Sequence, residues 1–169
     1  MTLAREMALE SEYVMGTFAR KPVEFVEGHG MTLIDDAGNE YLDFLSGIGV
    51  CSLGHCHPSI VQAVSDQAAK LIHVSNYYYI EHRGEVAQLL SNMLNAYVDE
   101  PSPEAWKTFF ANSGAEANEC AVKIARKYGE KRGAYKIVTL NNSFHGRTLT
   151  TLAATGQEGF HKDFLPLTE

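Results

Sequence analysis

This sequence of 169 residues is poor in cysteine and has no apolar run near the roughly 18–20 residues needed to cross a bilayer. Its three cysteines, Cys51, Cys56 and Cys120, form no disulfide framework, because the number is odd and the chain is not cysteine-rich. The N-terminal segment lacks the long apolar core of a signal peptide. We therefore expect a soluble, cytoplasmic protein.

Basic residues are also scarce: 14 Lys and Arg against 21 Asp and Glu give a formal net charge of −7. Broad binding to nucleic acid or to an acidic membrane requires clustered Lys and Arg to neutralise phosphates. The composition therefore argues against both partners, although it leaves room for a local anion site. With 45% apolar and 21% charged residues, the chain has the balance of a folded globular protein.

Histidine and cysteine cluster at Cys51, His55, Cys56 and His57, but this spacing is not typical of a metal site. Structural zinc sites present two well-separated pairs of ligands, and adjacent side chains cannot all point towards one ion. We predict no metal.

The first 57 residues are predicted to form the N-terminal segment of a small domain. Apolar residues recur at helical spacing over residues 3–19. Three alternating segments separated by glycine-containing turns predict an antiparallel meander, with strands at residues 22–26, 31–35 and 40–44. The glycine-rich segment that follows, residues 46–58, is predicted to be a loop.

Residues 58–169 are predicted to begin a larger α/β domain. Helices are expected at residues 58–71, 81–94 and 116–128, and strands at residues 106–111 and 135–140. A strand, a glycine loop, a helix and a second strand are typical of a βαβ unit with a parallel sheet. Because a sheet covered by helices normally has more than two strands, we expect this region to be the front of a larger sheet.

The segment Ser113-Gly114-Ala115-Glu116 fits a capping box at the start of the predicted 116–128 helix. Gly114 and Ala115 have little bulk, which leaves the backbone N–H groups of the first turn open. Such a helix start offers unpaired donors and a partial positive charge, which suit a phosphate. Taken alone, the same residues are also explained by a capped helix that binds nothing.

A second cluster, Phe144, His145 and Arg147, follows the next predicted strand. In a parallel sheet both loops would emerge at the carboxyl edge, where ligands bind. An aromatic ring can lie flat on a heteroaromatic cofactor, and an arginine can bind a carboxylate through two hydrogen bonds. Considered singly, Phe144 is equally well a core residue and Arg147 a surface charge.

Together, the segments NSGAEANE at residues 112–119 and FHGR at residues 144–147 resemble the class III aminotransferases. These are fold-type I, pyridoxal-phosphate-dependent transferases of the α/β class. The upstream segment from Tyr41 to Gln67 also resembles this family, and it is most similar to the acetylornithine-type members. The likeness runs from about Phe18 to the last residue.

The resemblance implies a pyridoxal 5′-phosphate cofactor. Gly114 and Ala115 would bind its phosphate through their backbone, with Ser113 supporting the turn, and Phe144 would stack on its pyridine ring. Arg147 would bind the α-carboxylate of the amino-acid substrate. Family members complete the site with both subunits of a homodimer.

The resemblance also implies that no catalytic residue lies within residues 1–169. The lysine that forms a Schiff base with the cofactor, and the aspartate that faces the pyridine nitrogen, lie beyond residue 169 in family members. We therefore expect a parent enzyme that transfers an amino group from N-acetylornithine to 2-oxoglutarate in arginine biosynthesis. The chain by itself is expected to be inactive.

Several alternatives stay open on the sequence alone. The parent enzyme would instead be an ornithine, succinylornithine or 4-aminobutyrate aminotransferase of the same class, because residues that select the side-chain end of the donor are expected downstream. A non-catalytic module that keeps half a cofactor site is another reading. A generic phosphate-binding α/β domain explains the capped helix but not the spacing of Phe144 and Arg147.

Overall fold

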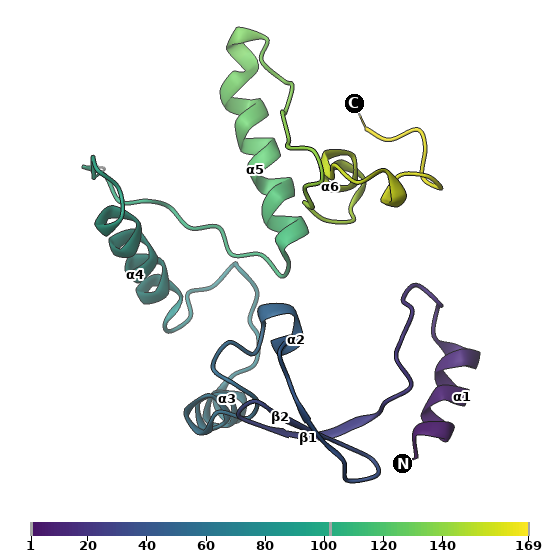
Figure 1. Ribbon diagram of the computed structural model, residues 1–169. Helices are drawn as coiled ribbons and strands as arrows, with labels where there is room; N and C mark the ends of the chain where they lie inside the picture. Colours follow the sequence, from purple (N-terminus) through teal and green to yellow (C-terminus); the bar gives the residue numbers. More distant parts are fainter. Residues whose placement is uncertain (1, 102, 169) are drawn as a thin grey trace. The chain divides into compact units, whose positions relative to one another are not determined.

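The computed structural model describes residues 2–101 and 103–168, and the chain divides into two compact units after Tyr79 (Figure 1). The first unit is residues 1–79, and its described residues form a small sheet and three helices. The second, residues 80–169, contains the predicted candidate site. The predicted domain boundary between residues 57 and 58 stays a prediction.

The sheet of the first unit is the predicted antiparallel meander, in the order β1-β2-β3. The strands are β1 (Phe25–His29), β2 (Thr32–Asp35) and β3 (Glu40–Leu42). β1 begins three residues later than predicted and continues through Gly28, because pairing with β2 extends its ladder up to the Gly30 turn.

The helices of the first unit are α1 (Leu3–Tyr13), α2 (Ser46–Gly49) and α3 (Pro58–Lys70). α1 is shorter than the predicted 3–19, because the backbone becomes extended at Val14, with φ −111° and ψ 131°. The predicted loop contains α2, a short kinked turn in which Gly47 and Ile48 are left-handed. α3 agrees with its prediction to within one residue.

The Asp35 carboxylate organises the turn between β2 and β3. It accepts hydrogen bonds from the backbone N–H groups of Ala37 (3.0 Å) and Asn39 (2.8 Å), from Asn39 Nδ2 (2.9 Å) and from the Tyr41 hydroxyl (2.9 Å). The side-chain hydrogen bond from Asn39 is the largest cause of a lowered Asp35 pKa. A buried carboxylate thus supports the turn through bonds to its charged form.

A second carboxylate, Asp43, closes the loop that contains α2. It accepts hydrogen bonds from the N–H groups of Leu45 (2.8 Å) and Ser46 (2.9 Å), and it lies 2.7 Å from His55 Nε2. The bond to His55 is the largest cause of a lowered Asp43 pKa. His55 therefore pairs with a carboxylate, and no group of three or more potential metal ligands occurs among the described residues.

The same loop is joined to the meander by backbone hydrogen bonds between Gly30 and His55, of 3.0 and 2.8 Å. Gly54 makes this approach possible. Its φ is +86°, and a Cβ at this position would lie 2.9 Å from the carbonyl oxygen of Gly30. A side chain at residue 54 would therefore push the loop away from the sheet.

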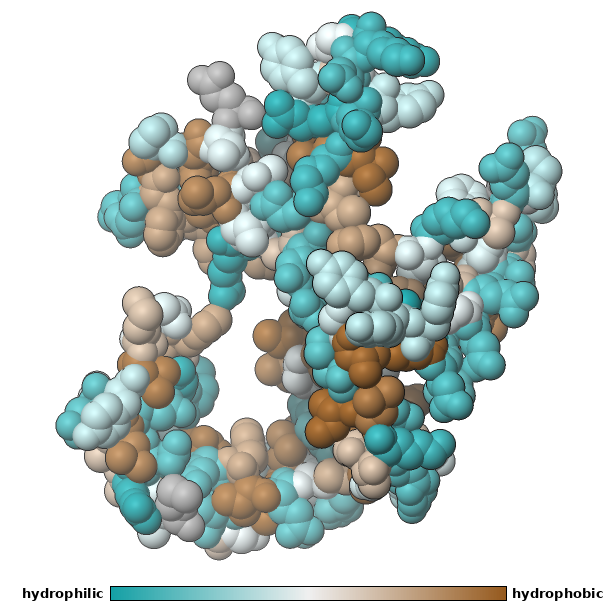
Figure 2. Space-filling view, turned by 180° about the vertical axis from the view of Figure 1, so that it is seen from behind, coloured by the Kyte–Doolittle hydropathy of each residue, from teal (hydrophilic) through white to brown (hydrophobic). Residues whose placement is uncertain are grey.

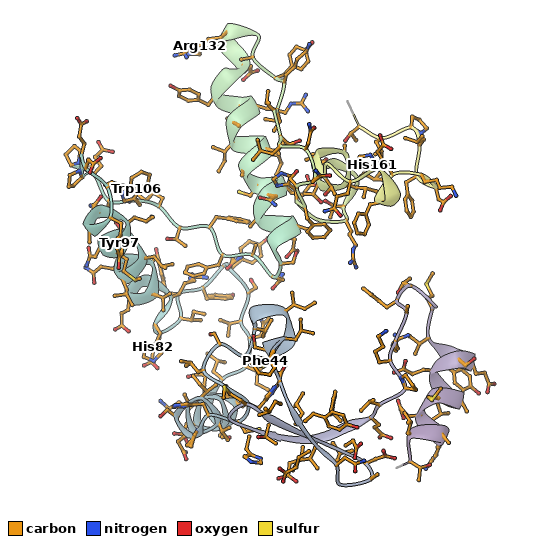
Figure 3. All side chains as sticks on the ribbon, in the orientation of Figure 1. Phe44, His82, Tyr97, Trp106, Arg132 and His161 are labelled. Carbon is orange, nitrogen blue, oxygen red and sulfur yellow. The ribbon has the colours of Figure 1, made fainter. Side chains whose placement is uncertain are left out.

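The helices of the second unit are α4 (Arg83–Ala96), α5 (Gly114–Gly129) and α6 (Leu149–Ala154), with 3₁₀ turns η1 (Glu130–Arg132) and η2 (Glu158–Phe160). α4 and α5 confirm two predicted helices. α5 begins at Gly114, two residues earlier than predicted, and α6 was not predicted. His161, labelled in Figure 3, joins η2 to α6, because its Nε2 lies 2.9 Å from the carbonyl oxygen of Leu152.

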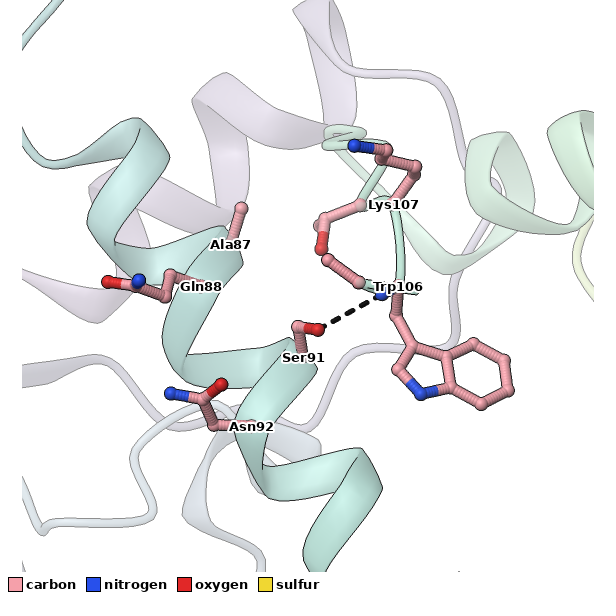
Figure 4. A pocket seen from close by; sticks show the side chains of 8 residues that line it. Ala87, Gln88, Ser91, Asn92, Trp106 and Lys107 are labelled. Carbon is pink, nitrogen blue, oxygen red and sulfur yellow. Dashed lines mark hydrogen bonds between the residues drawn. The ribbon is translucent and has the colours of Figure 1, made fainter. Parts of the chain in front are cut away.

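The predicted strands at residues 106–111 and 135–140 are wrong, because neither segment forms a strand and the sheet of the described residues contains only β1, β2 and β3. A strand exists only with a hydrogen-bonded neighbour, and neither segment has one. Trp106 instead bonds to α4, through its N–H to Ser91 Oγ (3.0 Å, Figure 4) and its Nε1 to Asn95 Oδ1 (2.7 Å). Ser91 and Trp106 line a pocket together with Ala87, Gln88, Asn92, Ala105, Lys107 and Thr108.

Apolar side chains are mostly exposed in the described chain, as the brown patches in Figure 2 illustrate. Among the described residues, the buried hydrophobic side chain is that of Leu152 in α6, which is 5% exposed. α4 leaves Val86, Leu89 and Met93 open to solvent. Within residues 2–101 and 103–168, no helix has both the length and the apolarity required to traverse a bilayer.

Replacing Gly54 with alanine is expected to destabilise the protein by about 1–3 kcal/mol, because the substitution adds a clash with Gly30 to an unfavourable φ. Gly38→Ala is the matched control, since Gly38 has a similar φ of +83° but open space around its Cβ position. Urea unfolding of both variants measures the difference. Equal losses for the two variants would contradict the proposed close approach.

Acid is expected to remove the contribution of the Asp35 and Asp43 carboxylates to stability. Both folded-state pKa values are lowered, so the stabilisation is present above the unfolded pKa of about 3.9 and is lost as pH falls through the folded pKa. Unfolding of wild type and Asp35→Asn between about pH 6 and 2 should therefore converge towards low pH. Asp66→Asn, on exposed α3, is the control; a constant gap between wild type and Asp35→Asn would refute this assignment.

Candidate functional site

The start of α5 is capped by its own sequence. Ser113 is the N-cap, and its Oγ accepts a hydrogen bond from the backbone N–H of Glu116 at 3.2 Å. The Glu116 carboxylate accepts from the N–H of Asn112 at 2.7 Å, one residue before the N-cap. The predicted cap by Ser113 is confirmed, and Glu116 reaches one residue further back than a capping box requires.

Gly114 and Ala115 occupy the first two positions of this 16-residue helix. Backbone N–H groups at these positions have no partner within the helix. Gly114 is exposed, and a Cβ built on it would meet nothing within 4 Å. The first turn of α5 therefore presents open donors at the positive end of a helix, which suit an anionic group.

The loop that carries Phe144 and Arg147 packs against this same turn. Gly146 is buried with φ +136°, and a Cβ there would lie 2.7 Å from Ala115 Cβ and 2.5 Å from Thr151 Oγ1. The structure thus brings the two sequence clusters together, as expected. The sequence predicted that the two loops would meet at a shared edge of a parallel sheet. In the structure they meet through close packing of Gly146 against Ala115.

Hydrogen bonds join this loop to α5 and α6. Asn118 Nδ2 donates to the carbonyl oxygen of His145 at 2.7 Å, and the His145 N–H donates to Thr155 Oγ1 at 3.0 Å. Thr155 Oγ1 also lies 2.9 Å from the carbonyl oxygen of Thr151. α6 is capped by Thr148, whose hydroxyl contacts Thr151 Oγ1 (2.7 Å) and donates to the Glu119 carboxylate of α5.

Phe144 and Arg147 form a cluster with Phe160 of η2. The Phe144 and Phe160 rings meet edge to face, with centroids 5.8 Å apart and planes inclined by 60°. Arg147 Cζ lies 5.8 Å from the Phe144 centroid and 5.9 Å from that of Phe160, within the range of cation–π attraction. Phe144 is 53% exposed, so it is not a core residue.

Two polar atoms beside this cluster are buried without a hydrogen-bond partner among the described residues: Ser143 Oγ and His145 Nε2. Buried polar atoms normally have a partner, so these two atoms are exceptions among the described residues.

Sequence reasoning missed three residues of this site. Phe160 lies 13 positions beyond Arg147 and no spacing rule singles it out, Thr155 resembles any helix-end threonine, and Asn118 is visible only as a polar residue one turn after Ala115. Their part in the site depends on contacts between segments distant in the sequence.

A profile of the class III aminotransferases matches residues 17–169 of this chain. The chain therefore belongs to the class III aminotransferase family, and the family's dependence on pyridoxal phosphate gives the candidate site its cofactor class.

Among curated relatives, the acetylornithine aminotransferase of Caldanaerobacter subterraneus subsp. tengcongensis is 52% identical over 163 residues, which are 94% of this chain and 39% of that protein. The acetylornithine aminotransferase of Wolinella succinogenes is 50% identical with the same coverage. The chain thus spans about two fifths of the length of these relatives.

Solved structures agree with the expected fold class. An ornithine aminotransferase from Toxoplasma gondii superposes with a TM-score of 0.83 at 30% identity, over 99% of this chain and 38% of that one. An acetylornithine aminotransferase from Elizabethkingia anophelis gives a TM-score of 0.72 at 35% identity, over 87% of this chain and 36% of that one. The predicted class, part of an α/β fold-type I transferase, is confirmed even though the two predicted parallel strands are unpaired.

The residues around α5 fit the family's cofactor. The open amides at Gly114 and Ala115 suit a phosphate, and the exposed Phe144 ring suits a flat heteroaromatic ring. The Arg147 guanidinium lies beside that ring, with its Cζ 5.8 Å from the ring centroid.

Gly146→Ala is expected to separate the loop from α5, because its Cβ would overlap Ala115 and Thr151. Two effects should follow: a loss of stability of about 1–3 kcal/mol from the strained backbone, and weaker binding of pyridoxal phosphate measured by absorbance titration. Gly159→Ala is the control, since a Cβ at Gly159 meets nothing within 4 Å. If both variants bind the cofactor like wild type, the contact with Ala115 does not shape the site.

Proposed function

We propose that this chain is the N-terminal part of an acetylornithine-type aminotransferase and contributes the phosphate-binding and substrate-carboxylate-binding part of its active site. The observation that carries the proposal is the packing of the Phe144–Arg147 loop on the open first turn of α5. The identity of 52% to an acetylornithine aminotransferase supports the choice of substrate.

In this proposal the cofactor phosphate is bound by the backbone N–H groups of Gly114 and Ala115. Ser113 keeps the turn in place through its bond to the Glu116 N–H. The partial positive charge of a helix start and the absence of a side chain at Gly114 both favour a doubly charged phosphate.

The Phe144 ring is proposed to cover one face of the cofactor's pyridine ring. Its exposure leaves apolar surface for such a contact, and stacked aromatic pairs gain about 0.5–1.5 kcal/mol beyond the burial of area. When bound, pyridoxal phosphate supplies the aldehyde and the electron-withdrawing ring that transamination requires.

Arg147 is proposed to bind the α-carboxylate of the amino donor and, in the second half of the reaction, that of the 2-oxo acid acceptor. The planar guanidinium offers two parallel N–H donors to a carboxylate, which fixes the orientation as well as the charge of the substrate. The neighbouring Phe144 and Phe160 rings limit the positions that the guanidinium can take.

The complete activity is proposed to be amino transfer from N-acetylornithine to 2-oxoglutarate in arginine biosynthesis, by a cytoplasmic homodimer. The catalytic lysine is proposed to come from sequence beyond residue 169, and we expect no transamination by residues 1–169 alone. Ornithine aminotransferase is the second candidate because of the TM-score of 0.83, but its identity is 30% against 52% for the acetylornithine enzyme.

Arg147→Lys in the full-length enzyme is expected to raise KM for N-acetylornithine roughly tenfold to a hundredfold. Lysine lacks the two parallel N–H donors of the guanidinium, and hydrogen bonds to a charged group contribute about 1.5–3 kcal/mol. Steady-state kinetics with N-acetylornithine and with an amino donor that has no α-carboxylate separate this role from a general loss of activity.

Arg132→Lys is the matched control, since Arg132 also faces an aromatic ring, that of Tyr128 at 5.4 Å, but follows the other end of α5 (Figure 3). A change in Arg147→Lys that is equal for donors with and without the carboxylate would remove Arg147 from substrate recognition. Absence of transamination by the full-length wild type would refute the function itself.

A further inference from the structure

Both backbone polar groups of His145, the N–H and the carbonyl oxygen, form hydrogen bonds with side chains. Its carbonyl oxygen accepts from Asn118 Nδ2 at 2.7 Å, and its N–H donates to Thr155 Oγ1 at 3.0 Å. Asn118 and Thr155 lie 27 and 10 positions from His145, so the bonds join three separate segments of the chain.

Both partners are well placed to restrain the loop. Thr155 is 1% exposed and its Oγ1 has a further bond, to the carbonyl oxygen of Thr151 at 2.9 Å, so its hydroxyl has little freedom. Asn118 is half-buried on α5, one helical turn after Ala115. The loop is therefore tied to the helix that begins the phosphate site and to the end of α6.

His145 lies in the sequence between Phe144 and Arg147, the two loop residues that are proposed to contact ligands. Phe144 precedes His145 directly, and Arg147 follows it by two positions through Gly146, whose φ of +136° only glycine adopts easily. A loop outside any helix or sheet has several backbone conformations, and each residue that is fixed loses conformational entropy. The bonds to His145 select one of these conformations.

We propose that Asn118 and Thr155 are positioning residues: by holding the two backbone groups of His145 they set the place of Arg147 relative to the first turn of α5, and so the distance between the substrate's carboxylate and the cofactor's phosphate. The inference rests on the proposed function for its ligands. Neither residue touches substrate or cofactor in this assignment, and both act through the loop.

A first test needs no catalysis. In the cofactor-free full-length protein, Thr155→Val removes the hydroxyl at nearly constant volume, Thr155→Ser keeps it, and Asn118→Leu removes the amide donor. Hydrogen exchange at the His145 N–H should accelerate on the order of tenfold or more in Thr155→Val, because local opening then lacks its main restraint. Thr155→Ser and the neighbouring control Thr150→Val, on α6, should stay close to wild type.

The second test separates positioning from general support. In Thr155→Val and Asn118→Leu, KM for the donor with an α-carboxylate should rise on the order of tenfold, since small misplacements of a binding group have large kinetic effects. KM for a donor without this carboxylate should change little, and Thr155→Ser should restore the wild-type value.

The proposal would be overturned if Thr155→Val and Thr155→Ser had the same hydrogen-exchange rate at the His145 N–H and the same KM. It would also be overturned if KM rose equally for donors with and without the α-carboxylate, because that result indicates a merely structural role. The proposed function fails differently: Arg147→Lys would then show no selectivity between the donors, while the exchange at His145 would still respond to Thr155→Val.

Discussion

The close contact between Gly146 and the first turn of α5 is the constraint on which the candidate site depends. Ala115 has only a methyl group and Gly146 has no side chain, so the loop can approach the helix where the open N–H groups begin. Any larger residue at either place would separate the proposed phosphate site from Phe144 and Arg147. Small residues at positions 115 and 146 are therefore required for two reasons. They leave the backbone accessible to an anion, and they allow the loop to pack against the helix.

Polar bonds to buried or half-buried side chains orient segments in both units, where apolar burial is limited among the described residues. In the first unit, the carboxylates of Asp35 and Asp43 each hold a turn through several donors. In the second, the hydroxyls of Thr151 and Thr155 are almost inaccessible and bind the backbone of α6 and of the neighbouring loop. Such bonds orient segments specifically, whereas exposed apolar faces like that of α4 offer large areas for further packing.

Much of the local structure could be predicted from the sequence. The meander, α3, α4 and α5 follow from alternation, helical spacing and capping residues, which act between near neighbours. The strands at residues 106–111 and 135–140 could not, because an apolar extended segment becomes a strand only beside a partner. Trp106 satisfies its donors with Ser91 and Asn95 of α4 instead. The short α6 escaped prediction because its capping pair, Thr148 and Thr151, has no apolar period to accompany it.

The sequence by itself determined the chemical types available for the site: a capped helix start at Ser113, an aromatic ring at Phe144 and a guanidinium at Arg147. It also determined the family, through the order and spacing of those motifs. Only the tertiary structure decided which other residues belong with them, since Phe160, Asn118 and Thr155 reach the loop through contacts between distant segments. The physical reason is that capping and helical period are local properties of the backbone, whereas packing and hydrogen bonds between segments depend on how the whole chain is arranged.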